Sequence, residues 1–74
     1  MNWLTNARNG DLRANTKTSS YHIHQAGNNV YALKQSKGGK FTSIGTFKGD
    51  TAITDAKRVV DRWDELAGIN SADN

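Results

Sequence analysis

The sequence predicts an α+β fold in which a three-stranded antiparallel β-sheet meander is covered on one face by a C-terminal amphipathic helix. Three observations predict this fold. Residues 50–68 have helical periodicity, residues 20–47 contain three strand-like runs separated by turns, and the connections are short enough for successive strands to pair. A helix laid across one face of such a sheet gives a two-layer architecture.

The predicted helix has one apolar side and one charged side. Its apolar residues recur at spacings of three and four, which places them in a single stripe along the helix. Asp50 or Thr51 can cap the first amide groups, and Gly68 is the kind of residue that commonly ends a helix. The stripe consists of Ala52, Ile53, Ala56, Val59, Val60, Trp63, Leu66 and Ala67.

The first predicted strand spans residues 20–26 and alternates in polarity. Tyr21 and Ile23 fall on the face toward the helix, and His22 and His24 fall on the opposite, open face. The next residues, 27–29, are Gly-Asn-Asn, which predicts a turn because these residues tolerate positive φ. This strand is therefore expected to pair with the run that follows.

The second predicted strand spans residues 30–35, and its two larger apolar residues are assigned to the helix face. Tyr31 and Leu33 are thus expected to join the first strand beneath the helix, where one of them packs against Trp63. Truncating a buried tryptophan costs roughly 3–5 kcal/mol, so Trp63 is expected to be central to stability. The alternate residues Val30, Ala32 and Lys34 then fall on the open face.

The third predicted strand spans residues 40–47 and follows the turn at residues 36–39. Gly45 is expected to mark a bulge at which the alternation shifts. Ile44 and Phe47 are assigned to the core, and Phe41 and Ser43 to the open face. A register error of one residue would reverse these assignments.

The domain organisation is expected to be simple, because 74 residues make one small domain with a modest core. Residues 1–19 are predicted to be a poorly ordered or partly helical N-terminal arm, residues 20–69 the βββα domain, and residues 70–74 a disordered tail. Two readings of Trp3 stay open: it covers one end of the core, or it is an exposed contact for a partner.

The composition limits the class of protein. The chain has no cysteine, which excludes a disulfide framework, and it has neither a long apolar run nor the layout of a secretion signal. It is therefore expected to be soluble and cytoplasmic, with no membrane partner. Residues 1–48 carry seven basic side chains and one acid, a local charge of +6, whereas residues 49–74 have a local charge of −3. Such asymmetry indicates an anionic partner, although it also serves solubility.

The sequence offers little evidence for catalysis or for a bound cofactor. The pair His22 and His24 has a spacing that could chelate a metal ion, but no third ligand is evident, and surface histidines are the commoner explanation. The run Gly38-Gly39-Lys40 lacks the spacing of a phosphate-binding loop. No nucleophile and base stand in a recognisable motif, so neither an enzyme nor a metal or cofactor site is expected.

The run Ile44-Gly45-Thr46-Phe47, followed by a capped amphipathic helix, resembles the AP2 domain and the related arm-type DNA-binding domains of phage integrases. The resemblance covers about residues 20–67. It implies that a three-stranded sheet lies in the major groove of DNA while the helix braces its back. AP2 domains, however, place several arginines and tryptophans on the binding face, and this sequence offers none there. Bidentate reading of guanine by sheet arginines is therefore not expected.

The resulting functional expectation is a small domain that binds duplex DNA through the open face of its sheet, mainly at phosphates. The resemblance implies contacts from His22 and His24 of the first strand, Lys34 of the second, and Phe41 and Ser43 of the third. Basic residues expected to add phosphate contacts are Lys37, Lys40, Arg8, Arg13 and Lys17.

Two alternatives of another class stay open. The chain could be a small phage or plasmid accessory protein that binds and modulates a host or viral protein through the same face, with Phe41 at an apolar centre. It could also be a subunit whose sheet pairs with a second copy of itself. The sequence does not separate these alternatives from DNA binding.

Overall fold

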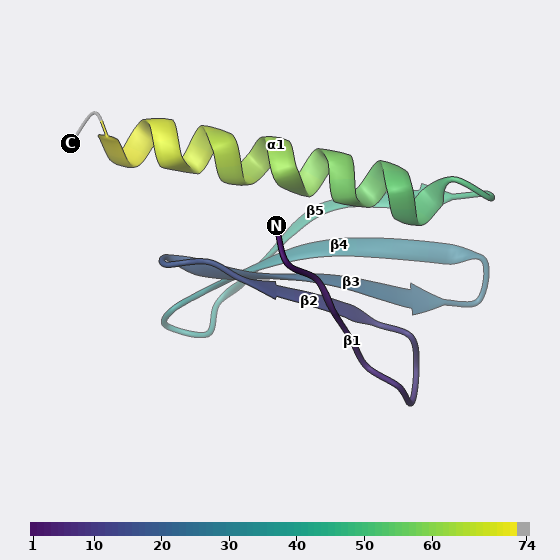
Figure 1. The fold of residues 1–74 in the computed structure, drawn as a ribbon. Helices are drawn as coiled ribbons and strands as arrows, with labels where there is room; N and C mark the ends of the chain where they lie inside the picture. The colour runs from purple at the N-terminus through teal and green to yellow at the C-terminus, as the bar shows by residue number, and fades with distance from the viewer. Residues whose placement is uncertain (73–74) are drawn as a thin grey trace.

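In residues 1–72, which this computed structural model describes, five antiparallel strands form one sheet in the order β1-β2-β3-β4-β5, and a helix lies across one face of it (Figure 1). The predicted α+β class, antiparallel meander and C-terminal helix are confirmed. The sheet, however, has two more strands than the three predicted. The elements are β1 (Leu4–Thr5), β2 (Leu12–Asn15), β3 (Ser19–Ala26), β4 (Asn29–Ser36), β5 (Phe41–Lys48) and α1 (Ala52–Ala72).

The two additional strands lie in residues 1–19, so the expected poorly ordered or partly helical arm is corrected. Strand β2 pairs with β3, with Leu12 opposite Ile23 and Ala14 opposite Tyr21. Leu12 and Ala14 are buried, and they alternate with exposed polar residues. An alternation of only two apolar residues is too short to identify a strand by its pattern, and pairing with β3 supplies the rest of the stabilisation.

The β3–β4 hairpin is confirmed, but its register differs from the prediction. Only Gly27 and Asn28 separate the strands, with Ala26 opposite Asn29 and Gly27 at a φ of 61°. The prediction assumed a three-residue turn. Removing one residue from the turn shifts the pairing by one, and a shift of one moves every side chain of the strand to the other face.

The residues of β4 that face the helix are therefore those that were predicted to lie on the open face. Ala32 pairs with Ile23 and Lys34 with Tyr21, so Val30, Ala32 and Lys34 share the face of the core. Tyr31 and Leu33 lie on the open face instead. The expected packing of Trp63 against Tyr31 or Leu33 is consequently wrong, because these side chains lie on opposite sides of the sheet.

The predicted bulge at Gly45 is confirmed by the pairing of β4 with β5. Leu33 is opposite Ser43 and Ala32 is opposite Gly45, which leaves Ile44 as the extra residue. Phe41 and Ser43 consequently lie on the open face, as predicted. Phe47 lies on the helix face, and both it and Ile44 are half-buried against the core.

The helix begins and ends close to the predicted positions, with one correction. The carbonyl of Thr51 accepts a hydrogen bond from the Asp55 amide at 2.8 Å, and the Thr51 hydroxyl donates to the Asp55 carboxylate at 2.9 Å. Thr51 therefore starts the helix. Gly68 does not stop it, because α1 continues to Ala72, so residues 70–72 of the predicted disordered tail are helical; residues 73–74 lie outside the described residues.

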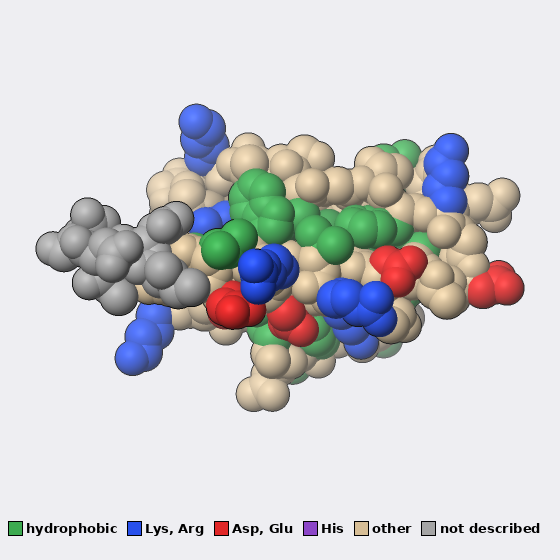
Figure 2. Space-filling model, turned by 90° about the horizontal axis from the view of Figure 1, so that it is seen from above, with side chains coloured by type: hydrophobic (Ala, Val, Ile, Leu, Met, Phe, Trp, Pro, Cys, Tyr) green, Lys and Arg blue, Asp and Glu red, His purple; other side chains and the backbone are tan. Residues whose placement is uncertain are grey.

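The helix presents its charged side to solvent and its apolar stripe to the sheet. Seen from the helix side, acidic and basic side chains line α1 beside a band of apolar side chains (Figure 2). Leu66 is an exception to the predicted stripe, because it is 45% exposed. Within residues 1–72, no helix has both the length and the apolarity needed to cross a membrane.

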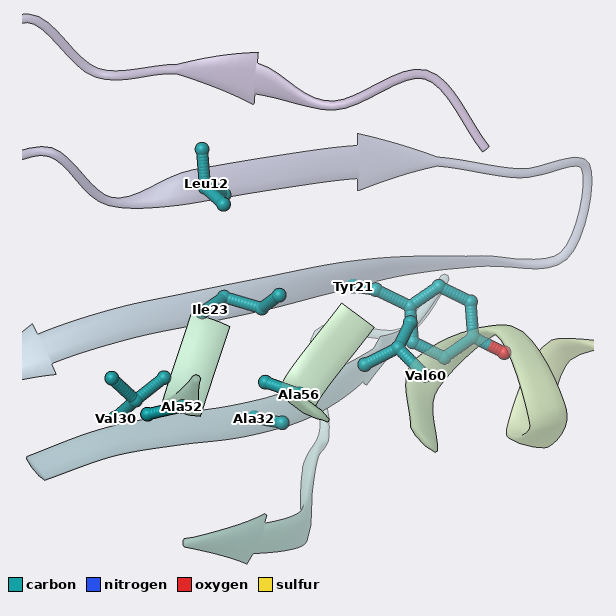
Figure 3. Close-up of a cluster of buried hydrophobic side chains, with 8 residues drawn as sticks. All are labelled: Leu12, Tyr21, Ile23, Val30, Ala32, Ala52, Ala56 and Val60. Carbon is teal, nitrogen blue, oxygen red and sulfur yellow. The ribbon is translucent and has the colours of Figure 1, made fainter. Parts of the chain in front are cut away.

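The core lies between α1 and the middle of the sheet, and the side chains that the helix contributes to it are small (Figure 3). Ala52, Ala56 and Val60 are four residues apart, so they line the same side of the helix. Their small size lets the helix lie close to the strands beneath it. The buried cluster consists of Leu12, Tyr21, Ile23, Val30, Ala32, Ala52, Ala56 and Val60.

Trp3 packs against the buried cluster from outside, and Tyr21 belongs to it. Trp3 is half-buried and packs against the cluster, which favours the reading that it covers the core. The Tyr21 ring is fully buried, and its hydroxyl donates to Asp64 Oδ1 at 3.5 Å. Burial raises the pKa of the Tyr21 phenol, and the Asp64 charge adds to the effect.

The register can be tested by truncating one residue on each face. Ile23→Ala removes a fully buried side chain and should lower the free energy of unfolding by about 2–5 kcal/mol. Leu33→Ala removes a half-buried side chain from the open face and should cost at most about 1 kcal/mol. Urea denaturation of both variants measures the difference. A larger loss for Leu33→Ala would place the helix on the other face of the sheet.

Candidate functional site

The face of the sheet opposite α1, here called the open face, has no element of the described chain packed on it (Figure 1). Residues directly opposite each other in an antiparallel sheet point to the same side, so the pairing identifies its members. Its central row crosses all five strands and contains Leu4, Arg13, His22, Leu33 and Ser43. The neighbouring rows add His24, Tyr31 and Thr46 on one side, and Asn15, Ser20, Gln35 and Phe41 on the other.

Aromatic and imidazole rings form two pairs on the open face. His22 and Phe41 have ring centroids 5.5 Å apart at an interplanar angle of 54°, and His24 and Tyr31 are 6.4 Å apart at 25°. Phe41 is 53% exposed. Exposed apolar area of this kind is unfavourable in water unless a ligand covers it. The two pairs are therefore the centre of the candidate site.

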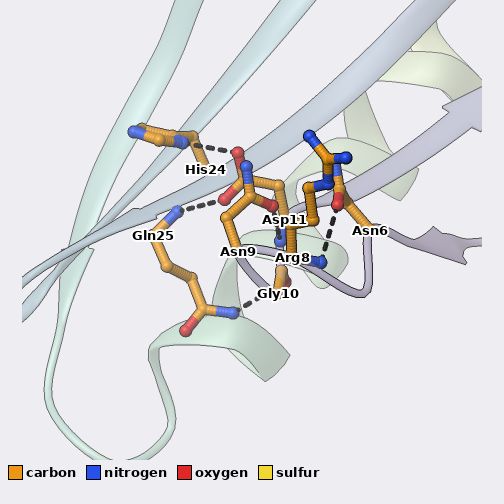
Figure 4. Close-up of polar contacts among 7 residues, drawn as sticks. All are labelled: Asn6, Arg8, Asn9, Gly10, Asp11, His24 and Gln25. Atoms are coloured by element: carbon orange, nitrogen blue, oxygen red, sulfur yellow. Dashed lines mark hydrogen bonds and ion pairs between the residues drawn. The ribbon is translucent and has the colours of Figure 1, made fainter.

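A carboxylate fixes the orientation of His24 (Figure 4). Asp11 Oδ2 lies 2.6 Å from His24 Nδ1, and Asp11 Oδ1 accepts a hydrogen bond from the Gln25 amide at 3.0 Å. Gln25 Nε2 in turn donates to the Gly10 carbonyl at 3.0 Å. The Asp11 amide donates to Asn9 Oδ1 at 2.9 Å. These bonds hold the β1–β2 loop against β3 and leave His24 Nε2 as the ring nitrogen not bonded to Asp11.

Opposing effects act on the pKa of Asp11. Partial burial raises the pKa of this carboxyl, but the hydrogen bonds from His24 and from the Gln25 amide, together with the charges of His24 and His22, outweigh it. The pKa of Asp11 is therefore below its ordinary value. The ionised form of Asp11 is the one that these contacts stabilise.

The other imidazole is held by an amide. The Gln35 side-chain oxygen can only accept, so His22 donates its Nε2 proton to it across 3.1 Å. Nearby, Asn15 Oδ1 accepts hydrogen bonds from Arg13 Nε at 3.2 Å and from the Ser20 hydroxyl at 2.8 Å. These three hydrogen bonds join side chains of the open face, two of them between neighbouring strands, and limit the side-chain conformations there.

Two shallow cavities border the ring pairs. One, of about 380 Å³, lies over β1, β2 and β3 and includes Leu4, Asp11, Arg13, His22 and His24 in its lining. The other, of about 170 Å³, is polar. It lies beside the β2–β3 and β4–β5 turns and is lined by Asn15, Thr16, Ser19, Ser20, Gln35, Ser36 and Lys37.

The structure brings together only some of the predicted cationic contacts. Arg13 lies on the open face, and Lys17, Lys37 and Lys40 lie in the β2–β3 and β4–β5 turns, which are at the same end of the sheet (Figure 1). Arg8 lies in the β1–β2 loop at the other end. Lys34 is misassigned in the prediction, because the two-residue turn places it on the helix face opposite Tyr21.

The predicted contacts His22, His24, Phe41 and Ser43 all lie on the open face. The two histidines are occupied by different partners, Gln35 and Asp11. Among the described residues, no group of three or more metal-ligating side chains is present. On the open face, each histidine pairs with an aromatic ring and makes a hydrogen bond to a neighbouring side chain.

Several members of the open face were missed from the sequence, among them Tyr31, Leu33 and Lys48. Tyr31 and Leu33 were assigned to the core, and Lys48, which pairs with Asn29 on the open face, was placed beyond the predicted end of its strand. The signal that identifies Tyr31 and Leu33 is the length of the β3–β4 turn. Reading Gly27-Asn28 as a two-residue hairpin turn gives the correct face for β4. Lys48 was missed because the predicted strand ended one residue too early.

No protein-family model matches the chain, and comparisons with curated proteins and with solved structures find no significant match. The function is therefore inferred from the open face itself.

The Asp11 contacts predict a dependence of stability on acid pH. A carboxyl group whose pKa is lower in the folded chain stabilises the fold fully above its unfolded pKa of about 4, and this stabilisation is lost as the pH falls through the lower folded value. In Asp11→Asn, the decline of unfolding free energy below about pH 4 should be shallower than in the wild type. Urea denaturation across this pH range measures it.

A second variant separates the two contacts of Asp11. His24→Gln removes the imidazole but leaves the Gln25 amide in place, so it should reduce the acid dependence less than Asp11→Asn does. An acid dependence identical to the wild type in both variants would contradict the assigned role of Asp11.

Proposed function

We propose that this protein binds nucleic acid through the open face of its sheet. The observation that carries the proposal is the separation of charge between the two layers. The described carboxylates other than Asp11 belong to the β5–α1 turn and to α1, on the helix side; they are Asp50, Asp55, Asp61, Asp64 and Glu65. These elements also carry Lys57, Arg58 and Arg62, so their described net charge is −2, whereas residues 1–48, which form the sheet and its turns, have a net charge of +6. A polyanion is therefore attracted to the sheet side more strongly than to the helix side.

The cations that surround the open face support this orientation. Arg13 and Lys48 lie on the face, and Lys17, Lys37 and Lys40 lie at one end of it. Among the described residues, Asp11 is the carboxylate that borders the face. Its two oxygens are already bonded to His24 and to the Gln25 amide. The local field at the open face is therefore favourable for phosphate groups.

The resemblance to AP2 and integrase arm-type domains stays a prediction and adds to this proposal. Strands β3, β4 and β5 followed by α1 have the order that the resemblance implies. Strands β1 and β2 extend the sheet beyond that pattern and bring Arg13 to the face. Duplex DNA is thus the first ligand to test.

A protein-binding function is the second candidate, because apolar side chains are exposed on the same face. Leu4 is 65% exposed and Phe41 is 53% exposed. Aromatic residues at the centre of an interface commonly dominate protein binding. This candidate predicts little dependence of affinity on salt concentration, whereas nucleic-acid binding predicts a strong one.

The salt dependence of binding tests the proposal. If Arg13, Lys48, Lys17, Lys37 and Lys40 each neutralise one phosphate, the logarithm of affinity for duplex DNA should fall with the logarithm of salt concentration with a slope of roughly −4 to −5. Arg13→Gln should reduce that slope by about one unit and weaken different DNA sequences alike. Fluorescence anisotropy at several salt concentrations measures the slope.

Two variants serve as controls for this measurement. Arg58→Gln removes an exposed cation from the helix, and Lys34→Ala removes one from the helix face of the sheet, so neither should change the slope. A loss of slope in Arg58→Gln equal to that in Arg13→Gln would mean that the helix side binds instead. Absence of nucleic-acid binding at about 50 mM salt would refute the proposed function.

A further inference from the structure

We infer that the ligand of the open face is single-stranded nucleic acid, with unpaired bases stacked on the rings of Phe41 and Tyr31. This inference rests on the proposed function and names the class of ligand. A duplex hides the faces of its bases within its own stack, whereas an unpaired base exposes both faces. Aromatic side chains on an open sheet bind such bases by stacking, with little regard to sequence.

The Phe41 ring is positioned to accept a base. It lies at the start of the edge strand β5, is 53% exposed, and has the imidazole of His22 beside it at 5.5 Å. The bulge at Ile44 sets the face of this part of β5, since it shifts the alternation between Ser43 and Gly45. Phe41, before the bulge, is therefore exposed to water. Phe47, after the bulge, lies on the helix face and packs against the core.

A second ring lies farther along the same face. Tyr31 stacks against His24 at 25°, and His24 is held by Asp11. Phe41 is opposite Gln35, which is four residues from Tyr31 on β4, so the backbone positions that carry the two rings are roughly 14 Å apart along the strand direction. Leu33 and His22 lie between them. The spacing leaves room for nucleotides between the two stacked bases.

The surroundings of Phe41 suit a sugar-phosphate backbone. Lys40 is its neighbour in the chain, and Lys37 lies in the same turn. The polar cavity of about 170 Å³ includes Gln35, which is opposite Phe41, as well as Asn15 and Ser20. Amide and hydroxyl groups of this kind can bind base edges or phosphate oxygens.

The open face is poorly equipped to read a duplex. Arg13 is the arginine that the described part of the chain places on it, and its Nε already donates to Asn15. Bidentate contacts from arginine are the commonest way to read guanine in the major groove. Most side chains of the open face are rings or short polar groups. Rings can stack on unpaired bases, and short polar groups can bind their edges.

The test compares single strands with their duplex. Fluorescence anisotropy is measured with the full chain and with oligo-dT, oligo-rU and a duplex, each about 12 units long. Either single strand should bind at least about tenfold more tightly than the duplex, and the tighter of the two identifies the natural class. Equal or tighter binding of the duplex would overturn this inference and leave the proposed function standing. Failure of all three to bind would overturn both.

Variants of Phe41 separate stacking from general apolar contact. Phe41→Leu keeps an apolar side chain but removes the ring, so the affinity for single strands should fall roughly 5- to 150-fold. Phe41→Trp keeps a ring and should retain the affinity. Leu66→Ala, at an apolar residue of similar exposure on the helix, is the matched control and should bind as the wild type does. Equal affinity of Phe41→Leu and Phe41→Trp would overturn the inference.

Discussion

The β3–β4 turn contains two residues, and that number decides which side chains of the sheet are buried. With Ala26 opposite Asn29, the residues of β4 that face α1 are Val30 and Ala32. One more residue in the turn would bring Tyr31 and Leu33 beneath the helix instead. Because β5 pairs with β4, the same turn also places Phe41. The composition of both faces therefore depends on the Gly27-Asn28 hairpin and on the positive φ of Gly27, which glycine adopts at little cost.

This register places the smaller apolar side chains of β4, Val30 and Ala32, in the core. Ala32 in the sheet lies under a helix that presents Ala52 and Ala56, so the two layers can approach closely. A small core stabilises a domain of this size only modestly, because little apolar area is removed from water. The larger side chains Tyr31, Leu33 and Phe41 would add to it if they were buried. Because they lie on the open face, their burial does not contribute to the free energy of folding, and binding of a ligand there can offset this.

Several elements could be predicted from the sequence because their patterns are long. The stripe of α1 repeats over about four turns, and β3 alternates between Tyr21, His22, Ile23 and His24 without interruption. These two elements gave the fold class and placed both histidines on the open face. The bulge at Gly45 was also recognisable, since glycine in a strand interior often marks one. His22, His24, Phe41 and Ser43 were accordingly assigned to the correct face.

The errors have equally specific causes. Strand β4 has apolar residues on both faces, so its alternation does not decide which face is buried. The prediction buried the larger residues, Tyr31 and Leu33, and this choice was wrong. The misplacement of Lys34 follows from that choice, whereas Lys48 was omitted because the third strand was expected to end at Phe47. Strands β1 and β2 have two and four residues, and their stability comes from pairing with β3, which no local pattern reveals. The second ring pair of the open face, Tyr31 with His24, became visible only once the register was known.

The two layers are coupled because β4 contributes to both. Its residues alternate between the core, through Val30 and Ala32, and the open face, through Tyr31 and Leu33. The open face exists only while β3, β4 and β5 are paired, so a ligand that binds it binds the folded chain and not the unfolded one. Such a ligand raises the apparent stability by an amount that grows with its concentration relative to Kd. If a ligand covers the open face, the aromatic residues that lie there and not in the core thus contribute to stability through binding.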